Sequence, residues 1–184
     1  MKPVANLLFE MRMLKDIVRS GYSFLGSGRE TIAEHCFTMA FICFVMSRLD
    51  TDIDGSKLMA MALLHDIPEA RTGDLNYVQK KYTQADEAKA ISDLINPLSF
   101  GNDIKVLIEE FNLGETREAK LAKDADQLSF VLELKKLEDT GAVSAEKWLP
   151  LVIGRIETPM GKQMAQGIME TRWDEWWTKD YSEE

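Results

Sequence analysis

The chain has 184 residues, of which 45% are hydrophobic, and its formal net charge is −9 at pH 7. This length and apolar content suffice for one domain with a buried core and argue against a disordered chain. The negative charge argues against a sequence-independent grip on duplex DNA and against binding to an anionic membrane. It does not exclude small nucleotides, because a bound cation can reverse the local field of an acidic site.

The N-terminal segment and the cysteines indicate where the protein works. Residues 1–10 lack a basic region followed by an apolar core, so no signal peptide is expected. The longest nearly apolar run, 36–46, is too short to span a bilayer. It contains both cysteines, Cys36 and Cys43, which on a helix would lie about 10 Å apart along the axis, too far for a disulfide. We expect a cytoplasmic protein whose partners include no membrane and no nucleic acid polymer.

Apolar residues recur at three- and four-residue spacing along most of the chain, which predicts helices. In chain order these helices are expected at 4–19, 31–49, 58–70, 84–96, 103–111, 115–139, 144–156 and from Pro159 onward. Residues 21–28 form a glycine-rich loop, and residues 50–55 form a polar break. No run of alternating β-branched residues, internal repeat or linker interrupts this pattern. The prediction is an all-α fold in which residues 1–184 form a single helical bundle.

Several residue types mark the ends of these helices. Thr31 and Glu34 have the spacing of a capping box, which opens the second helix. Thr158 and Pro159 pair an N-cap residue with a proline at the first helical position. Pro97 ends the helix at 84–96, and Gly141 ends the long helix at 115–139.

The chain has two histidines, His35 and His65, and each is expected inside a helix beside an acid. A lone histidine on an apolar helix is more often a satisfied core residue than a ligand. His65, however, is followed directly by Asp66. One ion lying beside the helix can contact both side chains, and imidazole with carboxylate suits divalent cations.

Two further acids follow these residues. Glu69 lies three residues beyond Asp66 and shares its helix face, and Asp74 follows at the helix exit. Acids near a helix end are usually solvated. Three acids beside His65 nevertheless repel one another unless a cation compensates them. Spacing alone leaves the metal site and the solvated acids as open alternatives.

Six short segments in a fixed order carry a more specific pattern. They are Arg19-Ser-Gly-Tyr22, Glu30-Thr-Ile-Ala-Glu-His35, His65-Asp-Ile-Pro-Glu69, Thr72-Gly-Asp74, Ala122-Lys-Asp-Ala-Asp126 and Trp176-Trp177. This set spans nearly the entire chain and resembles the HD-domain metal-dependent phosphohydrolases. More narrowly, it resembles the YfbR-type 5′-deoxynucleotidases.

The resemblance implies a bundle of helices around one divalent ion, with Mn, Co, Mg, Fe, Ni and Zn as candidates. By position, four residues match the family's protein ligands: His35, His65, Asp66 and Asp126. Glu69 and Asp74 match two acids that the family uses in catalysis, and Arg19 matches a phosphate-facing arginine. We expect Glu69 to lie nearest the attacking water. Tyr22 stands where the family carries a tryptophan near the sugar, so the preference between deoxyribose and ribose stays open.

Asp124 competes with Asp126 for the last ligand position. The two lie two residues apart on the long helix and therefore face different directions. The inward stripe of that helix, set by apolar neighbours, lies closer to Asp126; its members are Leu121, Ala122, Ala125, Leu128 and Ser129. The family motif also places the ligand after Lys-x-Ala. Both arguments favour Asp126.

Together these features predict a metal-dependent phosphohydrolase that releases phosphate from (deoxy)nucleoside 5′-monophosphates. Dinuclear HD phosphodiesterases recruit additional histidines, and this chain has only two. A mononuclear site and monoester hydrolysis are therefore favoured. The alternatives are an HD hydrolase of another phosphorylated metabolite and a metal-binding sensor without turnover.

Two expectations concern the surface. An apolar helix face left over after core packing suits a homodimer, as in the family. Trp173, Trp176 and Trp177 are expected to pack the C-terminal helix onto the bundle.

Overall fold

The computed structural model describes residues 1–181 and the side chains of residues 1–178. Its regular secondary structure consists of helices. In chain order they are α1 (Lys2–Arg12), the 3₁₀ turn η1 (Met13–Lys15), α2 (Tyr22–Leu25), α3 (Ile32–Leu49), α4 (Gly55–Leu64), α5 (Glu69–Thr72), η2 (Gln79–Lys81), α6 (Glu87–Ile95), α7 (Gly101–Leu113), α8 (Arg117–Asp139), α9 (Val143–Ile153), α10 (Pro159–Glu170) and α11 (Glu175–Tyr181). Residues 1–181 contain no strand beyond the isolated antiparallel bridge between Val18 and Thr31. The predicted all-α fold is confirmed.

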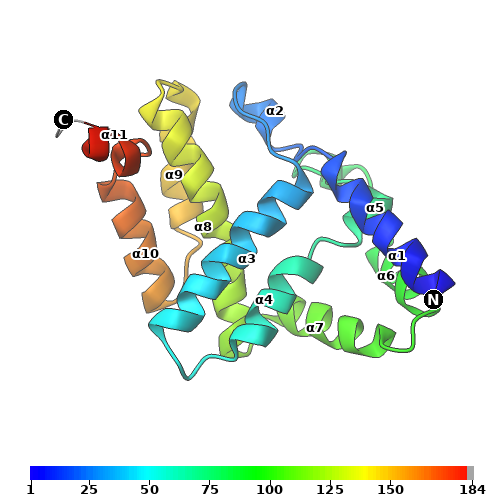
Figure 1. The fold of residues 1–184 in the computed structure, drawn as a ribbon. Coiled ribbons are helices and arrows are strands. Elements are labelled where there is room, and N and C mark those ends of the chain that lie inside the picture. Colours follow the sequence, from blue (N-terminus) through cyan, green and yellow to red (C-terminus); the bar gives the residue numbers. More distant parts are fainter. Residues whose placement is uncertain (182–184) are drawn as a thin grey trace.

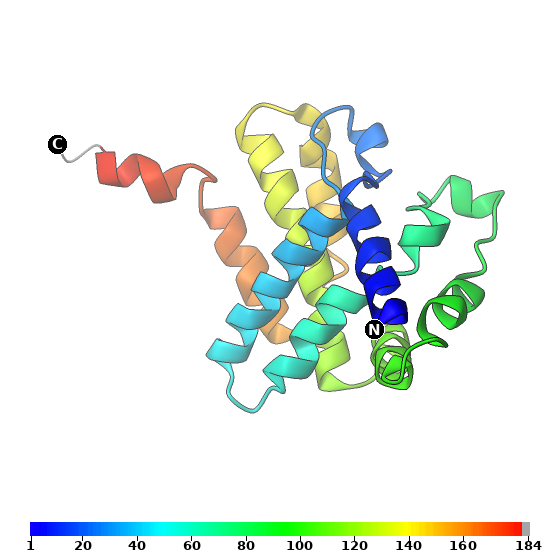
Figure 2. The same ribbon diagram turned by 45° about the vertical axis from the view of Figure 1, so that its right-hand side comes forward.

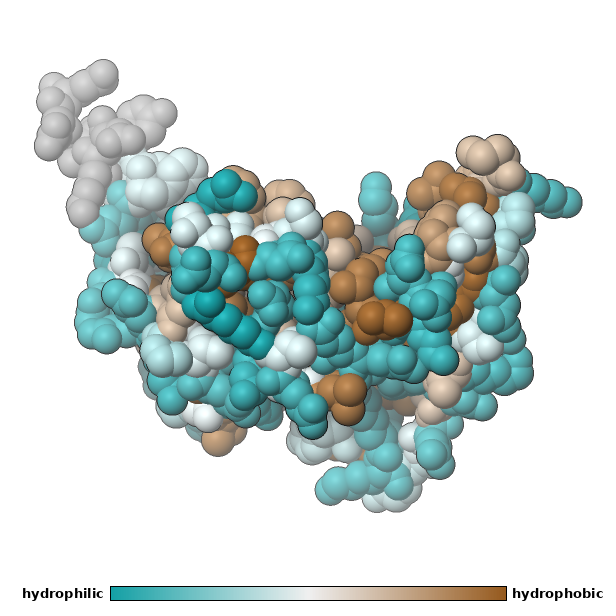
Figure 3. Space-filling view, turned by 90° about the horizontal axis from the view of Figure 1, so that it is seen from below, coloured by the Kyte–Doolittle hydropathy of each residue, from teal (hydrophilic) through white to brown (hydrophobic). Residues whose placement is uncertain are grey.

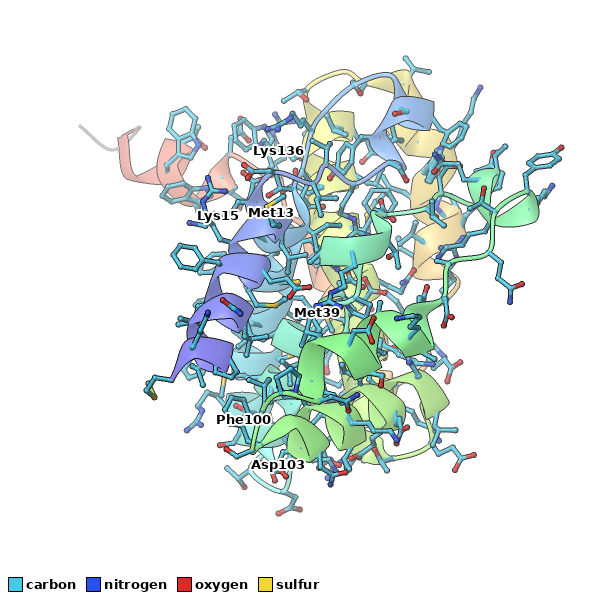
Figure 4. The ribbon with its side chains drawn as sticks, turned by 90° about the vertical axis from the view of Figure 1, so that its right-hand side faces the viewer. Met13, Lys15, Met39, Phe100, Asp103 and Lys136 are labelled. Carbon is cyan, nitrogen blue, oxygen red and sulfur yellow. The ribbon has the colours of Figure 1, made fainter. Side chains whose placement is uncertain are left out.

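Helix α3 crosses the middle of the molecule and packs against α4 and α8 (Figure 1). The larger core cluster joins these three helices with α9 and α10, and it includes Met39, which is fully buried and labelled in Figure 4. A second cluster joins α1, η1, α6 and α7 to Ile32 and Cys36 at the start of α3. His35 therefore lies on α3 between residues of both clusters.

Helix α3 is long and apolar enough, by length and composition alone, to cross a membrane. From the sequence, only the apolar run 36–46 was considered, which is too short to span a bilayer, whereas the whole helix has 18 residues. Core helices pass the same test, and 44% of α3 is buried inside the bundle. Its opposite face exposes Phe37, Phe41 and Phe44. The apolar character of α3 thus has two sources, a buried inner face and an exposed row of phenylalanines.

Viewed from below, the surface is largely hydrophilic, and hydrophobic patches gather in the right-hand half of the molecule, on the side of α1, α6 and α7 (Figure 3).

The first helix is shorter than predicted, because the chain leaves the helix before residue 19. Helix α1 ends at Arg12, and η1 completes its last turn. The chain then extends, so that the Arg19 N–H donates to the Glu30 carbonyl and the Ile32 N–H donates to the Ile17 carbonyl. This long-range backbone pairing overrides the local helical periodicity at 16–19.

The helix predicted at 58–70 is interrupted at residues 65–68, which include the candidate ligands His65 and Asp66. Helix α4 ends at Leu64, and α5 begins only at Glu69. Pro68 explains the break, because it has no N–H to bond the Leu64 carbonyl and its ring clashes with that group. His65 is consequently the C-cap of α4, and the expectation that it lies inside a helix was wrong.

The capping predictions are confirmed. The Thr31 N–H donates to the Glu34 carboxylate at 2.6 Å, and the Glu34 N–H donates to the Thr31 hydroxyl at 3.2 Å. At the start of α10, the Gly161 N–H donates to the Thr158 hydroxyl, and Pro159 occupies the first helical position. The first bond pair fixes the start of α3 three residues before His35.

Asp124 is buried and binds the segment that enters α10. Its carboxylate accepts the Glu157 N–H and the Thr158 N–H, each at 2.8 Å. Gly161 lies so close to this carboxylate that an added Cβ would collide with it. The inward stripe of α8 was expected to lie closer to Asp126, yet Asp124 is only 1% exposed. Its burial serves the packing of α10 on α8.

We predict that Asp124→Ala lowers the free energy of unfolding by about 3 kcal/mol, because two buried backbone donors lose a charged acceptor. Asp124→Asn, which keeps one acceptor oxygen, should lose less. Urea denaturation of the two variants measures the difference. A loss below about 1 kcal/mol for Asp124→Ala would mean that water replaces both bonds.

The C-terminal helix does not cover the bundle as expected. Helix α11 projects away from α8 and α10 (Figure 2). Trp176 is 77% exposed, whereas Trp177 and Trp173 are 41% and 37% exposed. Trp173 contacts α8, since Lys136 lies 5.8 Å from its ring and its backbone N–H donates to Asp139. The expectation that these aromatics pack onto the bundle was therefore wrong for Trp176.

Candidate metal centre

Three segments bring the four candidate ligands together. His35 lies in the first turns of α3, His65 ends α4, and Asp66 follows in the turn before Pro68. Asp126 lies in the middle of α8. Because α3 packs against both α4 and α8, the bundle core fixes the relative positions of these side chains.

The side chains approach closely enough to surround one ion. The Nε2 atom of His35 lies 3.1 Å from Oδ1 of Asp126 and 3.8 Å from Oδ2 of Asp66. The Nε2 atom of His65 lies 3.1 Å from Oδ2 of Asp66. Donor atoms of His35, His65 and Asp126 all lie within 4.8 Å of one another. Such spacing suits ligands placed around a divalent cation.

Hydrogen bonds at the far side of each ring indicate which nitrogen is free. The His65 Nδ1–H donates to the Ala62 carbonyl at 3.0 Å. The Ser129 hydroxyl donates to the Asp126 carbonyl at 2.8 Å, so its oxygen accepts from Nδ1 of His35, also at 2.8 Å. In the neutral form of each ring, this leaves Nε2 without a proton and close to the carboxylates, which is the tautomer that binds metal.

Unpaired buried polar atoms concentrate at this point. Across the described side chains, five such atoms have no hydrogen-bond partner: Arg19 Nη1, Ser27 Oγ, His35 Nε2, His65 Nε2 and Glu69 Oε2. Four of these five belong to residues expected in the site. A buried polar atom left unpaired is costly, so four of them in one cluster indicate a binding site for a polar ligand.

The pKa values of two carboxyl groups in the cluster, those of Glu69 and Asp126, are shifted in opposite directions. Burial, with the charges of Asp66 and Asp74, raises the pKa of Glu69 to about 9. Burial also acts to raise the pKa of Asp126, but its contacts with His35 and the positive charges around it prevail and hold that pKa below its usual range. Glu69 therefore holds a proton at neutral pH in the protein without metal, whereas Asp126 is anionic. A cation would relieve the repulsion among these acids.

Asp74 joins two segments that are far apart in the sequence. Its Oδ2 atom accepts the Ser20 N–H at 2.6 Å and the Ser20 hydroxyl at 3.1 Å. This contact fastens the segment after α5 to the segment that carries Arg19. The Arg19 guanidinium lies 5.8 Å from the centre of the Phe130 ring, one helical turn along α8 from Asp126. Arg19 thus borders the cluster.

Tyr22, which the family resemblance places near the sugar, is buried. It is 5% exposed, and its hydroxyl donates to Oε2 of Glu30 at 3.2 Å. The same carboxylate lies 3.8 Å from Nε of Arg19. Tyr22 therefore supports Arg19 through Glu30.

Three residues near the site were not singled out from the sequence. Glu30 was part of a family-like segment but had no assigned role, and Ser129 was counted only as an apolar-stripe neighbour. Cys36 was taken as a core residue, yet its sulfur lies within 4.8 Å of the donor atoms of His65 and Asp66. Burial raises the pKa of the Cys36 thiol, which disfavours the thiolate that a metal requires. Only a three-dimensional arrangement reveals these neighbours.

A cavity of about 420 Å³ borders the cluster on the side of Asp126. Its lining includes Phe111, Gln127, Lys120 and Lys123. The Gln127 amide donates to Oδ2 of Asp126 at 2.9 Å. This cavity gives solvent a route to the candidate ligand.

Glu30 generates a pH prediction. Burial raises its pKa from 4.5 to about 7 against the opposing charge of Arg19. Since the pKa is higher in the folded state, the stability linked to Glu30 is fully present below pH 4.5 and is lost as pH rises through 7. The free energy of unfolding of the wild type, relative to Glu30→Gln, should fall by up to about 3 kcal/mol across this window. Chemical denaturation at several pH values, with chelator present, tests this; parallel curves for the two proteins would contradict it.

The comparisons with known proteins agree with this geometry. The sequence model of a family described as HD domain matches residues 11–168. The 5′-deoxynucleotidase HDDC2 of Dictyostelium discoideum is 26% identical over 176 residues, which cover 86% of this chain and 93% of that protein. The human 5′-deoxynucleotidase HDDC2 is 28% identical over 133 residues, or 68% of this chain and 64% of the human protein. A solved structure of a conserved hypothetical protein from Pyrococcus furiosus aligns with a TM-score of 0.74 at 27% identity, covering 90% of this chain and 96% of that one.

Proposed function

Since the chain belongs to the HD domain family, we propose that it is a metal-dependent phosphohydrolase that releases phosphate from (deoxy)nucleoside 5′-monophosphates. One observation carries the proposal: unpaired buried atoms of His35, His65, Arg19 and Glu69 occur together beside two carboxylates. This set combines metal donors, a phosphate-binding cation and a proton-handling acid. The relatives named 5′-deoxynucleotidases support the nucleotide as substrate.

Four residues would hold the metal: His35, His65, Asp66 and Asp126. Two imidazoles and two carboxylates fit a divalent ion such as Mn, Co, Mg, Fe, Ni or Zn. When bound, such an ion supplies an acidified water and neutralises charge on the phosphoryl group. The two histidines suffice for one ion, which favours a mononuclear site.

The remaining residues handle the phosphate and the protons. In the reaction a water oxygen bonds to phosphorus, the bond from phosphorus to the 5′-oxygen breaks, and one proton moves from water to the departing oxygen. We assign Glu69 to the attacking water and Asp74 to the departing oxygen. Arg19 offers its unpaired Nη1–H groups to the phosphate, and Asp74 fixes the backbone next to Arg19 through Ser20.

We predict that the metal-loaded protein releases phosphate from dAMP or a related monophosphate. His65→Ala and Asp126→Ala should lose both the bound metal and the activity. Glu69→Gln should keep the metal, measured by elemental analysis, and lose at least about 100-fold in kcat. Asp103→Asn on α7, labelled in Figure 4, is the matched control and should behave as wild type, because its side chain is exposed and outside the cluster.

Two results would overturn these assignments. If protein loaded with Mn²⁺, Co²⁺ or Mg²⁺ releases phosphate from no monophosphate in a broad panel, the enzymatic proposal fails. If Glu69→Gln loses the metal, Glu69 is a ligand and the assigned roles are wrong. The ratio of activities on dAMP and AMP measures the sugar preference that the buried position of Tyr22 leaves open.

We also propose that residues 1–184 act as one domain in the cytoplasm and form a homodimer through the outer face of α3. Phe37, Phe41 and Phe44 follow helical spacing and are 71%, 58% and 41% exposed. A row of large apolar rings on one helix face is unfavourable in water and suits an equivalent row on a second copy. The two free, buried cysteines are consistent with a reducing compartment.

We predict that Phe41→Glu shifts the protein to a monomer, because a charge at the centre of this row cannot be buried without a partner. Sedimentation velocity of wild type and variant measures the change. Leu151→Glu is the control, because Leu151 is an exposed apolar residue on a different helix, α9, and its substitution should leave the dimer intact. A wild-type monomer at micromolar concentration, or a dimer that survives Phe41→Glu, would contradict the assignment of this face.

A further inference from the structure

Two exposed aromatic rings belong to the segments of the chain that carry Arg19 and Asp74. Phe24, on α2, is 42% exposed, and Tyr77, in the segment after α5, is 60% exposed. Their ring centroids lie 5.1 Å apart with an interplanar angle of 38°. Residues distant in sequence thus bring their rings into contact while each side chain stays partly exposed to solvent.

The backbone ties this aromatic pair to the site. Tyr77 lies three residues after Asp74, so its Cα is at most about 11 Å from that of Asp74. Phe24 lies four residues after Ser20, and the Phe24 N–H donates to the Gly21 carbonyl in the turn that opens α2. Ser20 itself is bonded to Asp74. The two rings therefore belong to the two segments that the bond between Ser20 and Asp74 joins.

The surroundings of the pair agree with this placement. Helix α2 and the segment with η2 lie on the same side of α3 in two views (Figures 2 and 4). Lys80, in η2, belongs to the same segment, and its positive charge acts to lower the pKa of the Glu69 carboxyl. Tyr22, the aromatic expected near the sugar, is buried and bonded to Glu30. Tyr82, at the end of η2, is 85% exposed, and Phe24 and Tyr77 are the exposed rings here that contact each other.

We propose that Phe24 and Tyr77 form the base-binding platform of this enzyme, on which the aromatic base of a nucleotide stacks while its phosphate lies at Arg19. This rests on the proposed function. Stacking on aromatic side chains accepts every base, because each base has a π-face. The side-chain oxygen of Asn76, the residue before Tyr77, accepts the N–H groups of Val78 and Gln79 and is therefore engaged within the protein. The platform therefore selects for the presence of a base and not for its identity.

The test compares a substrate with a base and one without. The ratio of kcat/KM for dAMP to that for 2-deoxyribose 5-phosphate is measured in wild type, Phe24→Ala, Tyr77→Ala and Tyr77→Leu. The ratio should fall about tenfold in each variant, mainly through KM for dAMP. Tyr77→Leu keeps apolar bulk without a flat ring, and circular dichroism checks that every variant is folded. Phe9→Ala, at an exposed aromatic on α1, is the control and should keep the wild-type ratio.

A rival position for the base is the cavity beside Asp126. If the base lies there, Lys120→Ala in the cavity lining lowers the ratio, while the Phe24 and Tyr77 variants retain it; this result overturns the platform. Calorimetric binding of dAMP and 2-deoxyribose 5-phosphate to the same proteins separates this inference from the proposed function. Wild type that binds dAMP more tightly than the sugar phosphate, with the difference lost in Tyr77→Ala, supports the platform even if turnover is absent. Equal binding of the two ligands by wild type overturns it even if dAMP is hydrolysed.

Discussion

Two imidazole nitrogens that are buried without hydrogen-bond partners, beside two carboxylates, are the constraint on which the rest of the structure depends. Leaving these atoms unpaired costs stability, and holding the acids together adds repulsion. The bundle core compensates for both, because α3, α4 and α8 pack tightly around the cluster. The outer bonds of each ring, from His35 to Ser129 and from His65 to Ala62, keep the free nitrogens aimed inward. A cation completes an arrangement that the protein alone leaves incomplete.

Much of this could be predicted from the sequence. Helical periodicity indicated the all-α fold, and the capping residues located the starts of α3 and α10 closely. The ordered segments from Arg19 to Asp126 indicated the HD family, which the match over residues 11–168 confirms. The ligand assignments remain proposals, although the structure brings all four side chains together.

Other features depended on contacts that no local pattern encodes. The break between α4 and α5 follows from one proline, which periodicity ignores. The apolar stripe indicated Asp126 as the more inward acid, and it gave no sign that Asp124 is buried too, where two backbone N–H groups from a distant turn compensate its charge. Tyr22 was assigned to the sugar because aromatic residues line such sites, whereas the structure commits its hydroxyl to Glu30. In each case a partner remote in sequence determined the outcome.

The bond between Ser20 and Asp74 has a consequence for local unfolding. It closes a loop of 54 residues, and both segments that it joins lie outside the long helices of the bundle. Opening this contact would release the segment that carries Asp74 from Ser20, while α3, α4 and α8 stay folded and Arg19 stays bonded to Glu30. Hydrogen exchange at the Ser20 amide would therefore report on a local motion of the phosphate side, with a free energy well below that of global unfolding. The metal ligands, positioned by the core helices, and Asp74, positioned by its bonds to Ser20, therefore differ in the stability of their framework.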